Sequence, residues 1–196
     1  MSPHLEEPPA SYLAQVGSQQ VALPVVPVSP DLSIALMMVI DHGVRFAETA
    51  GRELAAHFVH AAPDIVVAPA TLGIPVAIEV TRALGLDDYV ILQKTRKVHL
   101  ADALEARAHA ITSTSGAALL LDRARVAAVA GKRVLFVDDV ISTGSSSGAA
   151  LALLERAGAD VVGIGALLAE GDGWPEALRP YADRVFALGR IPLFRR

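Results

Sequence analysis

The chain has 196 residues, enough for one domain with its own core and too few for two full-sized enzymes in tandem. Hydrophobic residues make up 53% and charged residues 19%, which excludes a disordered chain and predicts a globular protein. Seventeen basic against 21 acidic residues give a formal charge of −4, which disfavours nucleic acid as a partner. The lack of cysteine excludes disulfides and thiolate metal sites, so any metal must bind oxygen or imidazole.

The first ten residues, MSPHLEEPPA, are acidic and rich in proline, unlike a secretory signal, so we expect a cytoplasmic location. No apolar run approaches the ~20 residues that a membrane helix needs, and we expect no membrane partner. Residues 1–20 are expected to form a loose N-terminal segment. Residues 21–196 are expected to form a single domain.

Short apolar runs alternate with segments of helical spacing through most of the chain. Helices are predicted at 44–59, 74–84 and 145–157, and strands at 64–68, 89–93, 117–121, 133–138 and 161–166. Strands that are apolar at every position are buried on both faces, as in a parallel sheet covered by helices. The predicted fold class is therefore α/β, with a doubly wound, mainly parallel sheet.

One long connection, residues 94–116, interrupts this alternation. It is rich in positive charge at its start, and connections of this length in compact domains are usually functional or disordered. Residues 101–110 are predicted to form a helical turn or two. The alternative interpretation is a solvated connector.

Residues 134–146, VLFVDDVISTGSS, combine a buried strand, two acids and a loop of hydroxyl and glycine residues before a helix. The start of that helix suits a phosphate, since its N–H groups lack partners and Gly144 permits close approach. Asp138 and Asp139 would repel a phosphate, so they should face sugar hydroxyls or a divalent cation. The alternative is an ordinary helix cap. Walker and dinucleotide-binding patterns are absent from the sequence.

This segment resembles the signature of type I phosphoribosyltransferases. The resemblance implies 5-phosphoribosyl 1-diphosphate as the ligand, with its ribose hydroxyls on Asp138 and Asp139. It also implies Mg²⁺, held mainly by the ligand's own oxygens, with the two aspartates as candidate protein ligands. The segment implied to bind the ligand, mainly at its 5′-phosphate, comprises Ser142, Thr143, Gly144, Ser145 and Ser146.

Two further segments are similar to the same family. The loop after the first core strand resembles its diphosphate-binding loop, through Ala70, Thr71, Leu72 and Gly73, although an ordinary strand-to-helix turn is the alternative. The connection 94–116 resembles its flexible closing loop. Lys94, Lys97 and His99, together with Arg96, would then neutralise the departing diphosphate, and Lys94 is favoured among them because it directly follows a strand. The candidate catalytic residues are thus Asp138, Asp139 and Lys94.

The acceptor base is predicted to be a purine, adenine first. Hypoxanthine–guanine members commonly have an aspartate where this chain has Ser142, whereas adenine members have a small residue there. Ala70 departs from the glutamate of adenine members, and residues 68–84 also resemble orotate members, so an orotate or 6-oxopurine enzyme is the alternative. A non-catalytic sensor of phosphoribosyl diphosphate is a third possibility.

A hood over the base is expected from residues 21–40 and 170–196, as the resemblance implies. Trp174, the only tryptophan, is a candidate for stacking on the base, with simple packing as the alternative. The expected partners are phosphoribosyl diphosphate, a nucleobase and a second copy of the chain in a homodimer.

Overall fold

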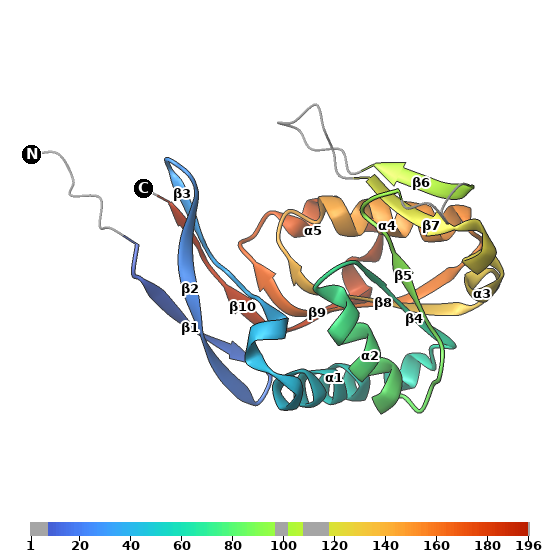
Figure 1. The fold of residues 1–196 in the computed structure, drawn as a ribbon, viewed down its shortest axis with the longest axis horizontal. Coiled ribbons are helices and arrows are strands. Elements are labelled where there is room, and N and C mark those ends of the chain that lie inside the picture. Colours follow the sequence, from blue (N-terminus) through green and yellow to red (C-terminus); the bar gives the residue numbers. More distant parts are fainter. Residues whose placement is uncertain (1–7, 97–101, 108–117, 196) are drawn as a thin grey trace, which may run out of the picture.

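A computed structural model of the chain describes residues 8–96, 102–107 and 118–195. Its centre is a five-stranded sheet in the order β10-β9-β8-β4-β5, and every neighbouring pair is parallel (Figure 1). The strands are β4 (Ile65–Pro69), β5 (Tyr89–Leu92), β8 (Arg133–Ile141), β9 (Asp160–Glu170) and β10 (Val185–Ile191). The predicted α/β fold with a parallel sheet is confirmed.

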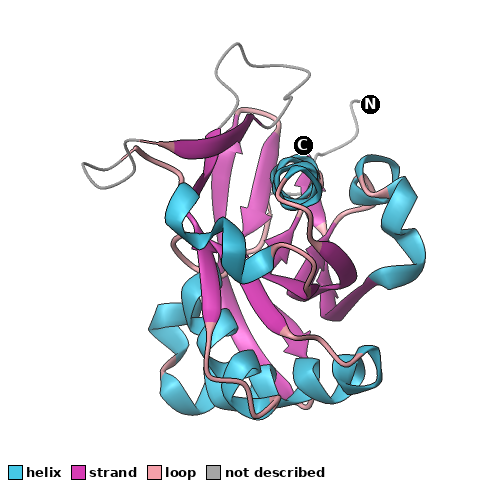
Figure 2. Cartoon of the chain, turned by 90° about the vertical axis from the view of Figure 1, so that its right-hand side faces the viewer, coloured by secondary structure: helices cyan, strands magenta, loops and turns pink. Residues whose placement is uncertain are grey.

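Helices cover both faces of this sheet, as Figure 2 shows. Adjacent residues of β8 point to opposite faces: Leu135 and Val137 join the core cluster of α1 and α2, whereas Val134 and Phe136 join that of α4. All four side chains are fully buried, which explains the uninterrupted apolar run. The three predicted helices are confirmed as α1 (Val44–Phe58), α2 (Gly73–Ala83) and α4 (Ser145–Arg156).

Shorter helical segments connect these elements. They are α3 (Val126–Val129), α5 (Trp174–Ala177) and the 3-10 turns η1 (Val39–His42), η2 (Val59–Ala61), η3 (Arg123–Arg125) and η4 (Arg179–Arg184). Within the described ranges, no helix combines the length and the apolar character needed to cross a membrane.

A second, antiparallel sheet forms a hood beyond the carboxyl ends of the core strands, drawn at the left of Figure 1. It has the order β1-β2-β3-β11, with β1 (Ser11–Val16), β2 (Gln19–Ser29), β3 (Leu32–Ala35) and β11 (Leu193–Arg195). The expected loose segment 1–20 is wrong from residue 11 onward, because β1 pairs with β2 along its whole length. Residues 170–196 were expected to belong to the hood, but β10 pairs with β9 in the core sheet, and β11 is the strand of this region that joins the hood.

The hood is attached to the core at the turn between β1 and β2. The Gly17 N–H donates to the Leu188 carbonyl at 3.0 Å, and Glu53 of α1 accepts a hydrogen bond from the Ser18 N–H at 3.1 Å. β1 crosses β10 so closely that a Cβ on Gly189 would lie 1.8 Å from the Gln15 carbonyl oxygen. Only glycine allows the two backbones to meet there.

Part of the long connection is a strand. β6 (Ala103–Arg107) pairs antiparallel with β7 (Ala118–Asp122), so the helical turns predicted for 101–110 are wrong over 103–107. Leu104 and Ala106, two residues apart, both pack against the α4 side of the core, and this spacing fits a strand. β7, predicted as one of the core strands, lies outside the parallel sheet and meets it through a bridge between Leu120 and Gln93.

Candidate functional site

The candidate site lies where β4 and β8 run side by side in the centre of the sheet. β4 leads into α2 and β8 leads into α4, and these two helices belong to opposite core clusters. The strand order therefore reverses between β4 and β8, and ligands of open α/β sheets bind at the carboxyl ends of strands at such a point. The loops 70–72 and 142–144 both begin at this edge.

In the first loop, two of the backbone groups are already used. The Ala70 N–H donates to the Leu92 carbonyl at 2.8 Å, and the Thr71 carbonyl accepts from the Ile74 N–H at 3.2 Å. The Ala70–Thr71 peptide bond is cis. The N–H groups of Thr71, Leu72 and Gly73 donate to no other described residue. An anion contact in this loop would thus come from the N–H groups of 71–73 at the start of α2, since the Ala70 N–H already donates to Leu92.

Asp138 and Asp139 occupy the end of β8. Asp138 is only 7% exposed, and one of its oxygens accepts the Asp139 N–H at 2.9 Å. Burial, followed by the charge of Asp139, raises the pKa of Asp138 well above its usual range, while the charge of Lys94 acts in the opposite direction. A Cβ on Gly73 would lie 3.4 Å from an Asp138 oxygen, so this carboxyl group adjoins the start of α2.

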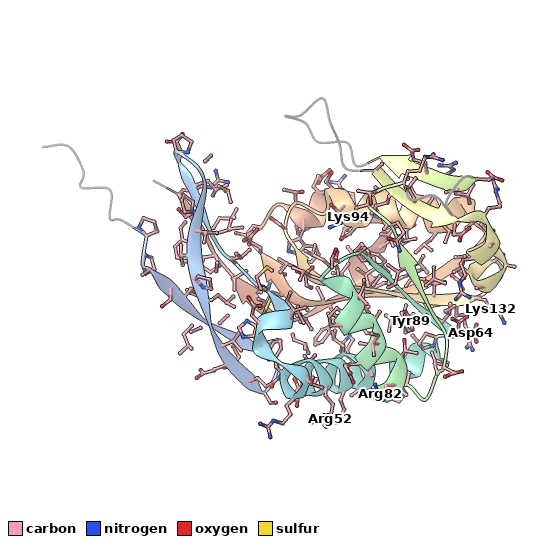
Figure 3. All side chains as sticks on the ribbon, in the orientation of Figure 1. Arg52, Asp64, Arg82, Tyr89, Lys94 and Lys132 are labelled. Carbon is pink, nitrogen blue, oxygen red and sulfur yellow. The ribbon has the colours of Figure 1, made fainter. Side chains whose placement is uncertain are left out.

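Lys94 lies just beyond β5 and its charge acts on Asp138, which brings it to the same edge of the sheet. Figure 3 labels Lys94 toward one end of the core strands, whereas Asp64 and Lys132 lie toward the other end. The predicted ligands Lys97 and His99 lie outside the described residues. Of the two predicted basic residues that the structure describes, Lys94 is the one whose charge acts on Asp138, whereas Arg96 lies 3.3 Å from Glu105.

The second loop turns sharply into α4. Gly144 has φ +75, and a Cβ there would come within 2.9 Å of the Ala177 Cβ. The Thr143 hydroxyl accepts a hydrogen bond from the Ser145 N–H at 3.3 Å, as in a helix cap. Ser145 and Ser146 form the first turn of α4, so the predicted 142–146 segment surrounds a helix start suited to an anion.

Two cavities open beside this loop, between the core and the hood. The larger has a volume of about 680 Å³ and is lined by Tyr12, Ser142, Thr143, Glu170, Gly171, Asp172, Gly173, Arg190, Ile191, Pro192, Leu193 and Arg195. The smaller, of about 250 Å³, is lined by Ile34, Ala35, Leu36, Met37, Leu72, Asp139, Val140, Ser142 and Glu170. The smaller cavity therefore joins β3 of the hood to the first loop and to the end of β8.

Trp174 lines neither of these cavities. It packs against the core cluster that contains α4, and the guanidinium carbon of Arg190 lies 5.9 Å from its ring centre. Its buried indole N–H has no hydrogen-bond partner among the described residues. Its predicted stacking on a base has no support in this geometry.

Glu170 was missed by sequence reasoning, although it lines both cavities. The available signal was its position: it is the first acid after an apolar run from 161 to 169 and follows a strand predicted to be parallel. No recognisable motif surrounds it. Among the described residues, no group of three or more acidic or histidine side chains could hold a metal unaided.

Comparison with known proteins identifies one family. A model described as "Phosphoribosyl transferase domain" matches residues 45–187. A hypoxanthine/guanine phosphoribosyltransferase from Methanococcus voltae is 34% identical over 110 residues, covering 56% of this chain and 54% of its own length. An orotate phosphoribosyltransferase from Caldanaerobacter subterraneus is 28% identical over 128 residues, covering 65% and 56%. The chain thus spans about half the length of these curated relatives.

A similar solved structure is that of an enzyme named for adenine. The adenine phosphoribosyltransferase of Giardia lamblia, complexed with 9-deazaadenine, has a TM-score of 0.70 and 24% identity, covering 86% of this chain and 93% of that one. At this level of identity, the likeness is one of fold.

Proposed function

Because the chain belongs to the phosphoribosyl transferase domain family, as the segment 134–146 predicts, we propose that it transfers ribose 5-phosphate to a nucleobase. The donor is 5-phosphoribosyl 1-diphosphate, and diphosphate is released. The acceptor is a purine, adenine first. The observation that carries this proposal is the pair formed by buried Asp138 and half-buried Asp139, set between two helix starts at the point where the strand order reverses.

Each part of the donor has a counterpart at this edge. The helix start at 142–146 suits the 5′-phosphate, and the N–H groups of 71–73 suit the diphosphate. Asp138 and Asp139 accept hydrogen bonds from the ribose hydroxyls and favour the positive charge that develops on the sugar ring. Lys94 stabilises the negative charge of the departing diphosphate. Little proton transfer is required of the protein.

Mg²⁺ fits this set of groups through shared coordination. The two aspartates are too few to hold the ion alone, but Mg²⁺ usually takes one or two carboxylates together with phosphate oxygens. Asp138 and Asp139 would supply the former and the substrate the latter. The ion would neutralise charge on the leaving group.

The smaller cavity is the proposed base site. Its walls come from β3, Leu72 and Val140, and Ser142 presents a small side chain there. A flat ring between apolar walls fits this lining. The hypoxanthine–guanine and orotate enzymes are the alternatives to an adenine enzyme, because the similar proteins are named for all four bases.

We also propose that the protein is a homodimer. A groove of about 280 Å³ between η1, α1 and α2 has mostly apolar walls, and Ile40 and Val44 beside it are 59% and 76% exposed. Apolar patches of this kind mark interaction sites. Light scattering should give twice the chain mass, and Val44→Asp should shift it toward the monomer. A wild-type monomer would contradict the proposal. The cytoplasmic location stays a prediction.

The deciding experiment mixes the protein with Mg²⁺, phosphoribosyl diphosphate and each of adenine, hypoxanthine, guanine, xanthine, uracil and orotate. We expect diphosphate and a nucleotide to form, fastest with adenine. Reactions without a base measure hydrolysis of the donor and serve as the control. Tight binding of the donor without turnover of any base would reject the enzyme and favour the sensor.

A further inference from the structure

Glu170, the last residue of β9, is a buried acid that faces the proposed base site. It is 6% exposed, and its carboxylate forms no hydrogen bond or ion pair with another described residue. It lines both the larger and the smaller cavity. Its carboxylate oxygens are not among the fully buried, unpartnered atoms of the described residues, so they reach the cavity space, where a ligand can supply a hydrogen-bond donor.

The smaller cavity has acidic but no basic side chains among its described lining residues. Its walls are largely apolar, and the charged groups among its described lining residues are two acids, Asp139 and Glu170. Asp139 lies at the end assigned to the ribose. Glu170 is therefore the charged residue of this cavity that would contact the base. A carboxylate can only accept hydrogen bonds.

The basic residues of the neighbouring cavity do not change this balance. Arg190 and Arg195 line the larger cavity but not the smaller one. The side chain of Arg190 is 70% exposed, and its guanidinium lies 3.9 Å from Asp172. An anionic base in the smaller cavity would thus meet two carboxylates and no described cation.

We propose that Glu170 determines which base is accepted. Its carboxylate accepts a hydrogen bond from an amino or ring N–H of an uncharged base and repels a base that itself carries a carboxylate. The substrate class is then an uncharged, N–H-bearing base such as adenine, and orotate is excluded. This inference rests on the proposed function, because it assumes that the smaller cavity holds the base.

The test compares wild type with Glu170→Gln, which keeps the size of the side chain and removes its charge. Calorimetry measures the binding of adenine, hypoxanthine and orotate in the presence of Mg²⁺ and diphosphate, and steady-state kinetics give kcat and KM for each base. We expect Glu170→Gln to weaken the binding of adenine about 10- to 100-fold, seen mainly as higher Kd and KM values. The preference for adenine over orotate should shrink, and the affinity for phosphoribosyl diphosphate should stay within about twofold.

Glu176→Gln is the matched control, since Glu176 lies on α5, is exposed and lines neither cavity. It should leave every value unchanged. Unchanged base selectivity in Glu170→Gln would overturn the proposal. Wild type that binds orotate as tightly as adenine would also overturn it, even if the variant fails to fold. Binding of adenine that depends on Glu170 without any turnover would support this site and reject the transferase.

Discussion

Acidic residues at the two ends of the parallel sheet have opposite pKa shifts. At the amino end, Asp64 accepts hydrogen bonds from the Arg133 backbone N–H and from two guanidinium nitrogens, at 2.9 to 3.2 Å. Hydrogen bonds from Arg133 lower the pKa of Asp64 to about 2. At the carboxyl end, Asp138 is buried next to a second acid, and its pKa is raised. Figure 3 shows Asp64 and Lys94 at these opposite ends.

This difference leads us to expect a structural role for Asp64 and a ligand-binding role for Asp138. Asp64 has its partner within the chain, so its charged form is favoured in the folded state. Asp138 accepts the Asp139 N–H but forms no ion pair with a described residue, and burial and the charge of Asp139 disfavour its charged form. Substitutions at the two ends should therefore have opposite effects on stability and unequal effects on activity.

The largest effect is expected on turnover. Asp138→Asn should lower kcat/KM by about 100-fold, since a hydrogen bond to a charged group contributes about 1.5 to 3 kcal/mol. Asp139→Asn should behave similarly. Asp160→Asn, at the exposed start of β9, is the control and should leave turnover unchanged. Wild-type rates in both of the first two variants would show that the aspartates serve only the helix cap.

The next effect concerns the loop after β8. Gly144→Ala should destabilise the protein by about 1 to 3 kcal/mol, because the left-handed backbone disfavours alanine and the new Cβ would crowd Ala177. It should also weaken the binding of phosphoribosyl diphosphate, measured by calorimetry. Gly131→Ala, before β8, is the matched control: its φ is +69, but nothing lies within 4 Å of its added Cβ. Equal losses in both variants would remove the crowding argument.

A smaller effect is expected on the pH dependence of stability. Because the pKa of Asp138 is raised in the folded state, ionisation of this group costs stability as pH rises through the folded value. Asp138→Asn should therefore raise Tm at pH 7 by roughly a few degrees, and the gain should vanish below about pH 4. Differential scanning calorimetry of wild type and variant between pH 4 and pH 7 measures this difference in Tm. A lower Tm at pH 7 would contradict the assignment.

The smallest effect belongs to the amino end. The lowered pKa of Asp64 contributes stability above its ordinary value of 3.8, and that contribution is lost as pH falls through about 2. Asp64→Asn should lower Tm at pH 7 by about 1 to 2 °C, since the pair is solvent-exposed, and should leave turnover unchanged. Well below pH 2 the two proteins should have the same Tm. A loss of turnover would show that the two ends are coupled.

The sequence predicts the core sheet and much of the site because those features are local. Apolar runs set the buried strands, and residues 134–146 carry strand, acids and helix start in one continuous segment. Gly144 and the two aspartates could therefore be assigned from the amino-acid sequence alone. The parallel strand order also explains why Lys94 and Gly73 lie near Asp138.

The hood and the base cavity could not be predicted, since they depend on contacts between distant residues. β11 pairs with β3, and Glu53 of α1 binds the turn at Ser18. Glu170 gains its significance only when β3 closes the cavity above it. β6 was mistaken for helix because ALEAR favours helix locally, while pairing with β7 decides its conformation.

The crossing of β1 over β10 at Gly189 bears on the order in which the molecule folds. Gln15 and Gly189 come together across most of the chain, and β3 must likewise wait for β11. Closing such long loops costs more entropy than pairing β4 with β5 or β8 with β9. We therefore expect the carboxyl ends of β4 and β8 to come together early in folding and the smaller cavity, which is lined partly by β3, to close last. In unfolding, the hood should be the first part to detach.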